Sequence, residues 1–254
     1  MKPTALLSHI LSAMVLILLV AGCGSMRPVT DPALDKKASE RALAARSLNR
    51  DVKSSKGTGW VTLEMDGRKD RFRVAWAVKT PNRARITLLA SGIPFETIAG
   101  NGKSVTFFSH THAHGLYTAK GRDPDLKQAL HIRIRLSQIV SMLLGQIPLG
   151  QFDDAWFSPE APDQIILRQG KGSFVHVLDL DPDGTPRGLI RQDGSGNLVY
   201  DIQILSVKRV HGRDMPVDFL IRDRLGRSIR LILTQFIPNP PIKESVFVLT
   251  EPGS

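Results

Sequence analysis

Three histidines at alternate positions, His110, His112 and His114, are the first candidates for chemistry in this sequence. Imidazole nitrogens bind zinc, and on a strand all three rings would leave the same face. Steps of two residues along a strand separate such rings by about 6.5–7 Å, which is too far for tetrahedral coordination. No His-Glu-x-x-His motif accompanies them, and Gly115 follows directly. The pattern therefore favours histidines of a solvated loop, and we predict no metal site.

Other polar groups match catalytic and binding motifs only in part. Residues 170–173, Gly-Lys-Gly-Ser, lack the earlier glycine that a phosphate loop requires. Asp179, Asp181 and Asp183 are spaced as in a calcium loop, but Ile190 stands where that loop needs an acid. The sequence has no Gly-x-Ser-x-Gly elbow of a hydrolase. We therefore expect a protein that is not an enzyme and needs no cofactor.

Cys23, the single cysteine, follows an apolar segment that is densest from Ala13 to Val20. With Lys2 near the amino end, this arrangement is typical of an export signal, and its dense part is shorter than a membrane span of about 20 residues. One thiol cannot form an internal disulfide in an oxidising compartment. The four residues that end at Cys23, Val-Ala-Gly-Cys, resemble the lipobox of bacterial lipoproteins.

The lipobox resemblance implies that Cys23 receives diacylglycerol, that the signal is removed, and that the new amine is acylated. We therefore expect a signal peptide over 1–22, an acylated tether over 23–32 and one domain over 33–254. Gly24 follows the cysteine where an aspartate would imply retention at the inner membrane, so the resemblance favours the outer membrane, facing the periplasm. The alternative is a secretory signal or an uncleaved anchor with a chance cysteine.

The chain is basic, with a formal net charge of +10. Its Lys and Arg residues are scattered through strand-like segments, so most are expected to form a solvated surface. The excess charge predicts an anionic neighbour, either a phospholipid membrane surface or an acidic protein. Nucleic acid is not expected as a partner of an exported protein.

Alternation of apolar and polar residues predicts strands in both halves of the chain. The Asp66-Gly67 pair predicts a hairpin between the first two of them. A sheet this large must curl to bury one face. We therefore predict a mainly β (α+β) monomer: a single large curled antiparallel sheet that forms an open half-barrel covered by helices. The expected strands are 60–65, 72–78, 85–89, 95–99, 104–108, 198–204, 217–222 and 229–233.

Helix signals occur twice. Asp31-Pro32 provides a cap and a proline before 33–48, which is rich in good helix formers. Asp123-Pro124 repeats this signal before 126–131.

The segment after this second signal allows two interpretations. Apolar residues from Ala129 to Leu143 would suit one long amphipathic helix. Alternation over 131–136 instead favours an extended connection, followed by a short helix from Ser137 to Gly145. We favour two helices joined by an extended segment.

A series of short motifs follows the lipobox and the first helix in a particular order. Pro-Asn-Arg-Ala-Arg-Ile stands at 81–86, Gly-Ile-Pro at 92–94, Leu-Gly-Gln-Ile-Pro at 144–148, and Pro-Pro-Ile at 240–242 before Phe247. This order resembles the LolB-type outer-membrane lipoprotein receptors and the broader LolA/LolB-like lipoproteins. The resemblance implies an open barrel with helices over its mouth and an apolar hollow. That hollow would accept the acyl chains of a lipoprotein handed over by a periplasmic carrier protein.

An acyl chain needs only a water-excluding groove with aliphatic and aromatic walls. The LolB resemblance makes Ile93 the exposed residue of a membrane-insertion loop. The LolA resemblance makes Arg85 the counterpart of the arginine that holds the lid closed. The candidates for the wall of the hollow, which would equally suit a closed core, are Phe72, Val74, Trp76, Leu88, Tyr200 and Ile202.

The sequence thus predicts a lipid-anchored outer-membrane lipoprotein that binds acyl chains and takes part in lipoprotein localisation or insertion. The alternative is an envelope structural or assembly lipoprotein that uses the same scaffold to bind a protein partner.

Overall fold

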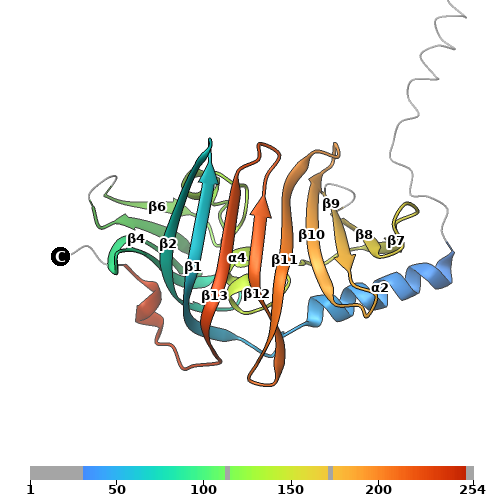
Figure 1. The fold of residues 1–254 in the computed structure, drawn as a ribbon, viewed down its shortest axis with the longest axis horizontal. Coiled ribbons are helices and arrows are strands. Elements are labelled where there is room, and N and C mark those ends of the chain that lie inside the picture. Colours follow the sequence, from blue (N-terminus) through green and yellow to red (C-terminus); the bar gives the residue numbers. More distant parts are fainter. Residues whose placement is uncertain (1–30, 112–114, 171–173, 250–254) are drawn as a thin grey trace, which may run out of the picture. The chain divides into compact units, whose positions relative to one another are not determined.

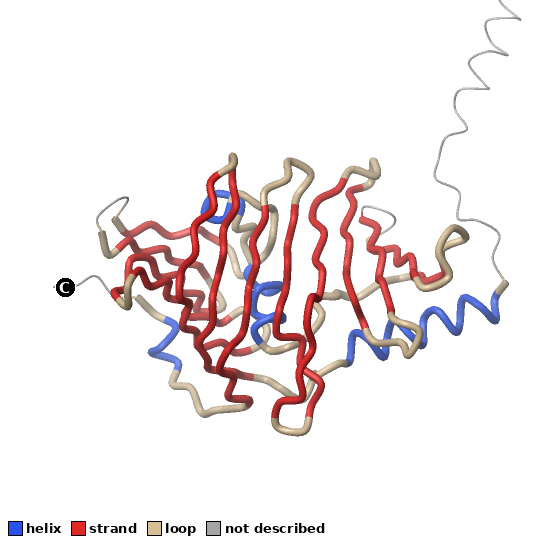
Figure 2. Tube along the Cα trace, viewed as in Figure 1, coloured by secondary structure: helices blue, strands red, loops and turns tan. Residues whose placement is uncertain are grey.

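A computed structural model describes residues 31–111, 115–170 and 174–249. Within these residues, thirteen strands form one antiparallel sheet in the order β6-β5-β4-β3-β2-β1-β13-β12-β11-β10-β9-β8-β7 (Figures 1 and 2). The described strands leave β6 and β7 at the two edges, so the sheet is not closed. The predicted single antiparallel sheet and open half-barrel are confirmed. The predicted signal and Cys23 lie outside the described residues.

Each half of the chain forms a run of hairpins, and the two runs meet in the middle of the sheet. There β1 pairs with β13, with Val61 opposite Leu231. The first run comprises β1 (Ser54–Met65), β2 (Arg68–Lys79), β3 (Arg83–Ala90), β4 (Ile93–Asn101), β5 (Ser104–Ser109) and β6 (Leu116–Lys120). The second comprises β7 (Asp154–Phe157), β8 (Gln164–Gln169), β9 (Phe174–Leu180), β10 (Pro186–Asp193), β11 (Leu198–Val210), β12 (Arg213–Arg222) and β13 (Ser228–Pro238).

The helices are α2 (Pro32–Ser47), α3 (Lys127–Leu130), α4 (Leu136–Leu143) and the 3-10 helix η1 (Glu244–Phe247). The interpretation with two short helices in the middle is confirmed. α3 ends at His131, whose φ of 57° is left-handed and cannot continue a helix. The connection to α4 is extended, and a bridge pairs Asp125 with Arg135. None of the described helices combines the length and the apolar character needed to cross a bilayer.

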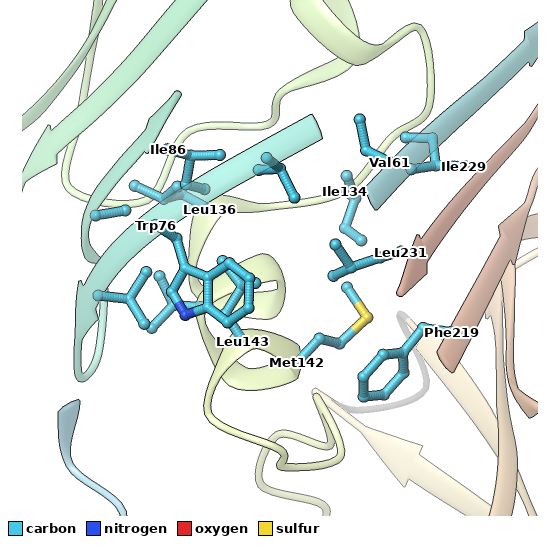
Figure 3. Close-up of a cluster of buried hydrophobic side chains, with 14 of the residues drawn as sticks. Val61, Trp76, Ile86, Ile134, Leu136, Met142, Leu143, Phe219, Ile229 and Leu231 are labelled. Atoms are coloured by element: carbon cyan, nitrogen blue, oxygen red, sulfur yellow. The ribbon is translucent and has the colours of Figure 1, made fainter. Parts of the chain in front are cut away.

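The buried side chains form two clusters. The larger cluster joins strands β1–β5 and β11–β13 to the segment that carries α3 and α4, and Figure 3 shows Trp76, Leu136 and Phe219 within it. The second cluster joins α2 and residues 147–149 to strands β7–β10. Spacings of four and three residues place Ala38, Ala42 and Ala45 on one face of α2, where all three are buried. Their small side chains allow α2 to pack closely against the sheet.

Candidate functional site

A cavity of about 70 Å³ lies between the sheet and the segment that carries α3 and α4. Every residue that lines it is aliphatic, so its walls offer no side-chain hydrogen-bond partner. Such a space suits hydrocarbon and excludes polar groups. The lining residues are Val61, Leu63, Val74, Ile86, Leu88, Ile98, Leu126, Leu130, Leu136, Ile139, Leu143, Ile221, Ile229 and Leu231. We call this space the aliphatic cavity.

The aliphatic cavity is small because residues 123–147, here called the cover segment, occupy most of the space above the sheet. The volume of the aliphatic cavity is far smaller than that of a typical ligand pocket, which is about 300–1,000 Å³. A space of this size does not hold a whole acyl chain in the observed arrangement. The almost fully buried residues of the cover segment are Leu126, Ile132, Ile134, Leu136, Val140, Met142, Leu143, Leu144, Gln146 and Ile147.

Buried hydrogen bonds hold α4 against the sheet. The Ser55 hydroxyl donates to the carbonyl oxygen of Leu143 at 2.6 Å and accepts a bond from the Trp76 indole N–H at 3.1 Å. The Gln138 amide donates to the Tyr200 hydroxyl. Buried polar groups that lose such partners carry a free-energy cost of about 1–3 kcal/mol each. These bonds therefore stabilise the observed position of the cover segment against the sheet.

Two further sets of bonds fix the ends of the cover segment. Asp123 accepts bonds from the Ser137 N–H at 2.8 Å and from its hydroxyl at 2.7 Å, at the start of α4. At the other end, the buried Gln146 amide donates to the carbonyl oxygens of Asn49 and Val52, each at 2.9 Å. The Asp123 bonds thus join the start of the cover segment to α4 within the segment itself, and the Gln146 bonds attach its other end to the rest of the domain.

The six predicted wall residues separate into three groups. Val74 and Leu88 line the aliphatic cavity. Phe72 is half-buried beside the same cluster, with its ring 4.6 Å from that of Phe95. The remaining three, Trp76, Tyr200 and Ile202, are buried in the surrounding core.

Sequence reasoning missed most of the wall that the cover segment and the last strands contribute. The signal was present, because Ile139 and Leu143 fall on the apolar stripe from 129 to 143 and Ile229 lies on the apolar face of a predicted strand. The sequence assigned these residues to an amphipathic helix or a strand and did not identify them as walls of a hollow.

Ile93 lies at an exposed hairpin, as predicted, with 70% of its surface accessible. Ser91 and Gly92 both have positive φ, of 51° and 84°, which is the geometry of a tight two-residue turn. Because neighbouring strands are antiparallel, this turn lies at the same end of the sheet as the turn between β12 and β13. The latter carries Leu225, 66% accessible, which the sequence did not single out.

Arg85 lies away from the cover segment's hydrogen bonds. Its guanidinium donates to the carbonyl oxygen of Val246 at 3.4 Å and links β3 to η1. The cover segment is held by bonds from Ser55, Gln138 and Gln146.

The polar motifs singled out in the sequence have other environments. His110 lies 2.9 Å from the Thr97 hydroxyl, while His112 and His114 fall outside the described residues. Across the parts of the chain that the structure describes, no three His, Cys, Asp or Glu side chains gather as metal ligands would. Asp179 and Asp181 instead form ion pairs with a common arginine, Arg187, at 3.0 and 3.4 Å.

No family model and no curated protein matches this sequence. Solved structures do match its fold. A DUF1329 family protein from Desulfovibrio piger superposes with a TM-score of 0.61 at 10% identity, covering 86% of this chain and 98% of its own. A LolA superfamily protein from Nitrosomonas europaea gives 0.57 at 14% identity, with coverage of 84% and 97%.

A third structure, described as an outer membrane lipoprotein-sorting protein domain from Vibrio parahaemolyticus, gives a TM-score of 0.58 at 11% identity and covers 84% of this chain and 97% of its own. At these identities the likeness concerns the fold alone. The LolA/LolB-like fold that the sequence motifs implied is confirmed.

Proposed function

We propose that this chain binds acyl chains between its sheet and its cover segment, and takes part in the localisation or insertion of lipoproteins at the outer membrane. The observation that carries the proposal is the aliphatic cavity, whose fourteen lining residues are all Val, Leu or Ile. A hydrocarbon tail needs no hydrogen-bond partner, so such walls bind it by excluding water. The LolA superfamily and lipoprotein-sorting proteins of the same fold support the same class of ligand.

Binding would require the cover segment to open, and the cost of opening would set the apparent affinity. Each 1.4 kcal/mol by which the closed cover segment is more stable than the open one weakens the apparent affinity for an acyl chain about tenfold. The hydrogen bonds of Ser55 and Gln138 contribute to that cost. The acyl chain would move from one apolar binding site to another that is more apolar, and no bond would be made or broken. The protein would act as a monomeric receptor for cargo from a periplasmic carrier.

The anchor in this proposal is acylated Cys23, which would hold the domain at the outer membrane and facing the periplasm. The net charge of +10 would add attraction to anionic headgroups.

A photoactivatable palmitate analogue tests the proposal directly. We expect the full chain in phosphatidylcholine nanodiscs to be labelled on the peptides that contain Val74, Leu88 and Ile139, which line the cavity. Unlabelled palmitate in excess should suppress this labelling, because it competes with the analogue for the same space. Peptide mass spectrometry locates the label. Labelling confined to exposed side chains, or unaffected by competition, would exclude an acyl site under the cover segment.

One observation favours the alternative function, an envelope structural or assembly lipoprotein that holds a protein partner. The aliphatic cavity has a volume of only about 70 Å³, so the closed domain is almost filled by its own side chains. The palmitate experiment separates the two functions, since a scaffold of this kind has no need to open.

Ile93→Glu should reduce transfer of a reporter lipoprotein into vesicles by about tenfold or more, because a buried isoleucine contributes about 1.5–3 kcal/mol and a carboxylate opposes insertion. The fold should persist, since Ile93 is exposed. Ile237→Glu is the matched control: Ile237 is 55% accessible but lies near the opposite end of the sheet, at the close of β13. Transfer by the Ile93→Glu variant at the unaltered rate would remove this turn from the mechanism.

A further inference from the structure

A second and larger cavity, of about 620 Å³, lies on the opposite face of α4. The helix turns Leu136, Ile139 and Leu143 toward the aliphatic cavity, and turns Ser137 and Ser141 toward this one. Its other walls come from the end of α2, the turn after β2, and strands β9 and β10. We call it the arginine cleft, after the residues Arg46, Arg50, Arg135 and Arg191 that line it.

Positive charge in the arginine cleft is not balanced by the protein. Four arginines line it against one carboxylate, that of Asp123. Asp123 already accepts two bonds from Ser137 and lies 3.8 Å from Arg135. Within the described parts of the chain, neither Arg46 nor Arg191 forms an ion pair. Burial and the neighbouring Arg46 lower the pKa of Arg50, as expected where like charges lie together.

Several arginines elsewhere in the domain form close ion pairs with a carboxylate. Arg168 pairs with Asp154, and Arg230 pairs with Asp218 at 2.7 Å. Among the described residues, Arg46, Arg50 and Arg191 form no such pair, and Arg135 only approaches Asp123, at 3.8 Å.

Arg191 is the most constrained of the four. Its guanidinium lies 4.0 Å from the centre of the Phe174 ring, which fixes the plane of the group. Its Nε is buried and has no hydrogen-bond partner among the residues that the structure describes. Burial and the charge of Arg191 lower the pKa of His176 to about 4, so this neighbour is neutral at pH 7 and does not add to the repulsion.

We infer that the arginine cleft is a binding site for a phosphate group, of the kind that an anionic lipid headgroup carries. Guanidinium groups donate paired N–H bonds that match two phosphate oxygens. The cleft volume of about 620 Å³ exceeds what a single phosphate fills, which favours a headgroup over the free ion. This site is separate from the aliphatic cavity, and the inference does not depend on acyl binding.

The test is a calorimetric titration of the full chain in a nonionic detergent at low salt, with two ligands. One is inorganic phosphate and the other is dihexanoyl phosphatidic acid, titrated against a detergent blank. Both should bind, and the Arg46→Gln/Arg191→Gln variant should bind each about tenfold more weakly or worse. Arg73→Gln, the control for the single Arg46→Gln variant, removes one charge from an exposed position outside the cleft and should change affinity by less than about twofold.

The pattern of results decides both the site and its ligand. Tighter binding of the lipid than of inorganic phosphate supports the site with a headgroup as its ligand, and equal binding supports the site with free phosphate as its ligand. Absence of binding by both, or equal weakening by Arg73→Gln, overturns the inference.

Two controls keep the result interpretable. Arg191→Gln also removes the contact with Phe174, so the single variant Arg46→Gln is measured as well, after its melting temperature has been found unchanged. If the single and the double variant both bind at full strength, the proposed site is wrong. Palmitate labelling is measured on the same samples. If the unaltered protein binds phosphate but is not labelled by the palmitate analogue, the acyl-binding proposal is wrong and the phosphate site in the arginine cleft still stands.

Discussion

The Cys23→Ser variant should move from the membrane fraction to the soluble fraction almost completely. Two or three acyl chains each contribute about 0.8 kcal/mol per buried methylene, so their loss removes most of the membrane affinity. The remaining attraction of a basic surface is weak and disappears at high salt. Cell fractionation in high salt measures the distribution, and intact mass spectrometry measures the amino terminus. The unaltered protein should begin at Cys23 and carry the mass of a diacylglycerol and an amide-linked acyl chain.

A Gly24→Asp variant supplies the matched comparison for this experiment. It keeps the acylated cysteine and should remain in the membrane fraction, but the lipobox resemblance implies that it moves from the outer to the inner membrane. Cys23→Ser protein that stays in the membrane with residues 1–22 attached would contradict lipid anchoring. That result would make the apolar amino-terminal segment itself the anchor.

Local pattern was sufficient for most strands and insufficient for some. β2 was predicted because Val74, Trp76 and Val78 alternate with half-buried residues, as they must when one face of a strand packs inward. β8 was missed because Ile166 interrupts the alternation between the buried Ile165 and Leu167. Helix signals worked where a cap and a proline preceded good helix formers, as in α2.

The aliphatic cavity could not be derived from local pattern, because its walls come from distant parts of the chain. The pairing of β1 with β13 brings Val61 beside Leu231, and no local signal specifies a register between strands so far apart. How closely the cover segment packs against the sheet also depends on residues that are far apart in the sequence. A Cβ at Gly100 would lie 2.4 Å from a terminal carbon of Leu136, so the glycine in β4 leaves the space that α4 occupies.

The arginine cleft, too, could not be predicted from the sequence alone. Along the sequence its arginines are separated by long stretches, and they were predicted to belong to a solvated surface. Folding gathers residues from α2, the start of α4 and β10 around one cavity. Net charge predicted an anionic partner but could not indicate where on the molecule that partner would bind.

Leu136→Ala should destabilise the protein and at the same time tighten acyl binding. Leu136 is fully buried, lies on α4 and lines the aliphatic cavity. Truncation of a buried leucine to alanine costs about 2–5 kcal/mol of unfolding free energy. In the proposed mechanism Leu136 leaves the sheet when the cover segment opens, so the lost packing belongs mainly to the closed state. Each 1.4 kcal/mol lost from that state should lower the half-saturating palmitate concentration about tenfold.

Leu178→Ala is the matched variant that separates this effect from general destabilisation. Leu178 is also fully buried, but it lies in β9 and belongs to the second cluster, which α2 covers. Leu178 does not line the aliphatic cavity, and the cover segment contributes to its cluster only through Ile147, so its truncation should lower the unfolding free energy and leave palmitate affinity nearly unchanged. Urea unfolding and concentration-dependent photolabelling measure the two quantities on each variant. If Leu136→Ala loses stability without any gain in affinity over Leu178→Ala, the cover segment is part of a permanently closed core, and the sheet interior is not an acyl site.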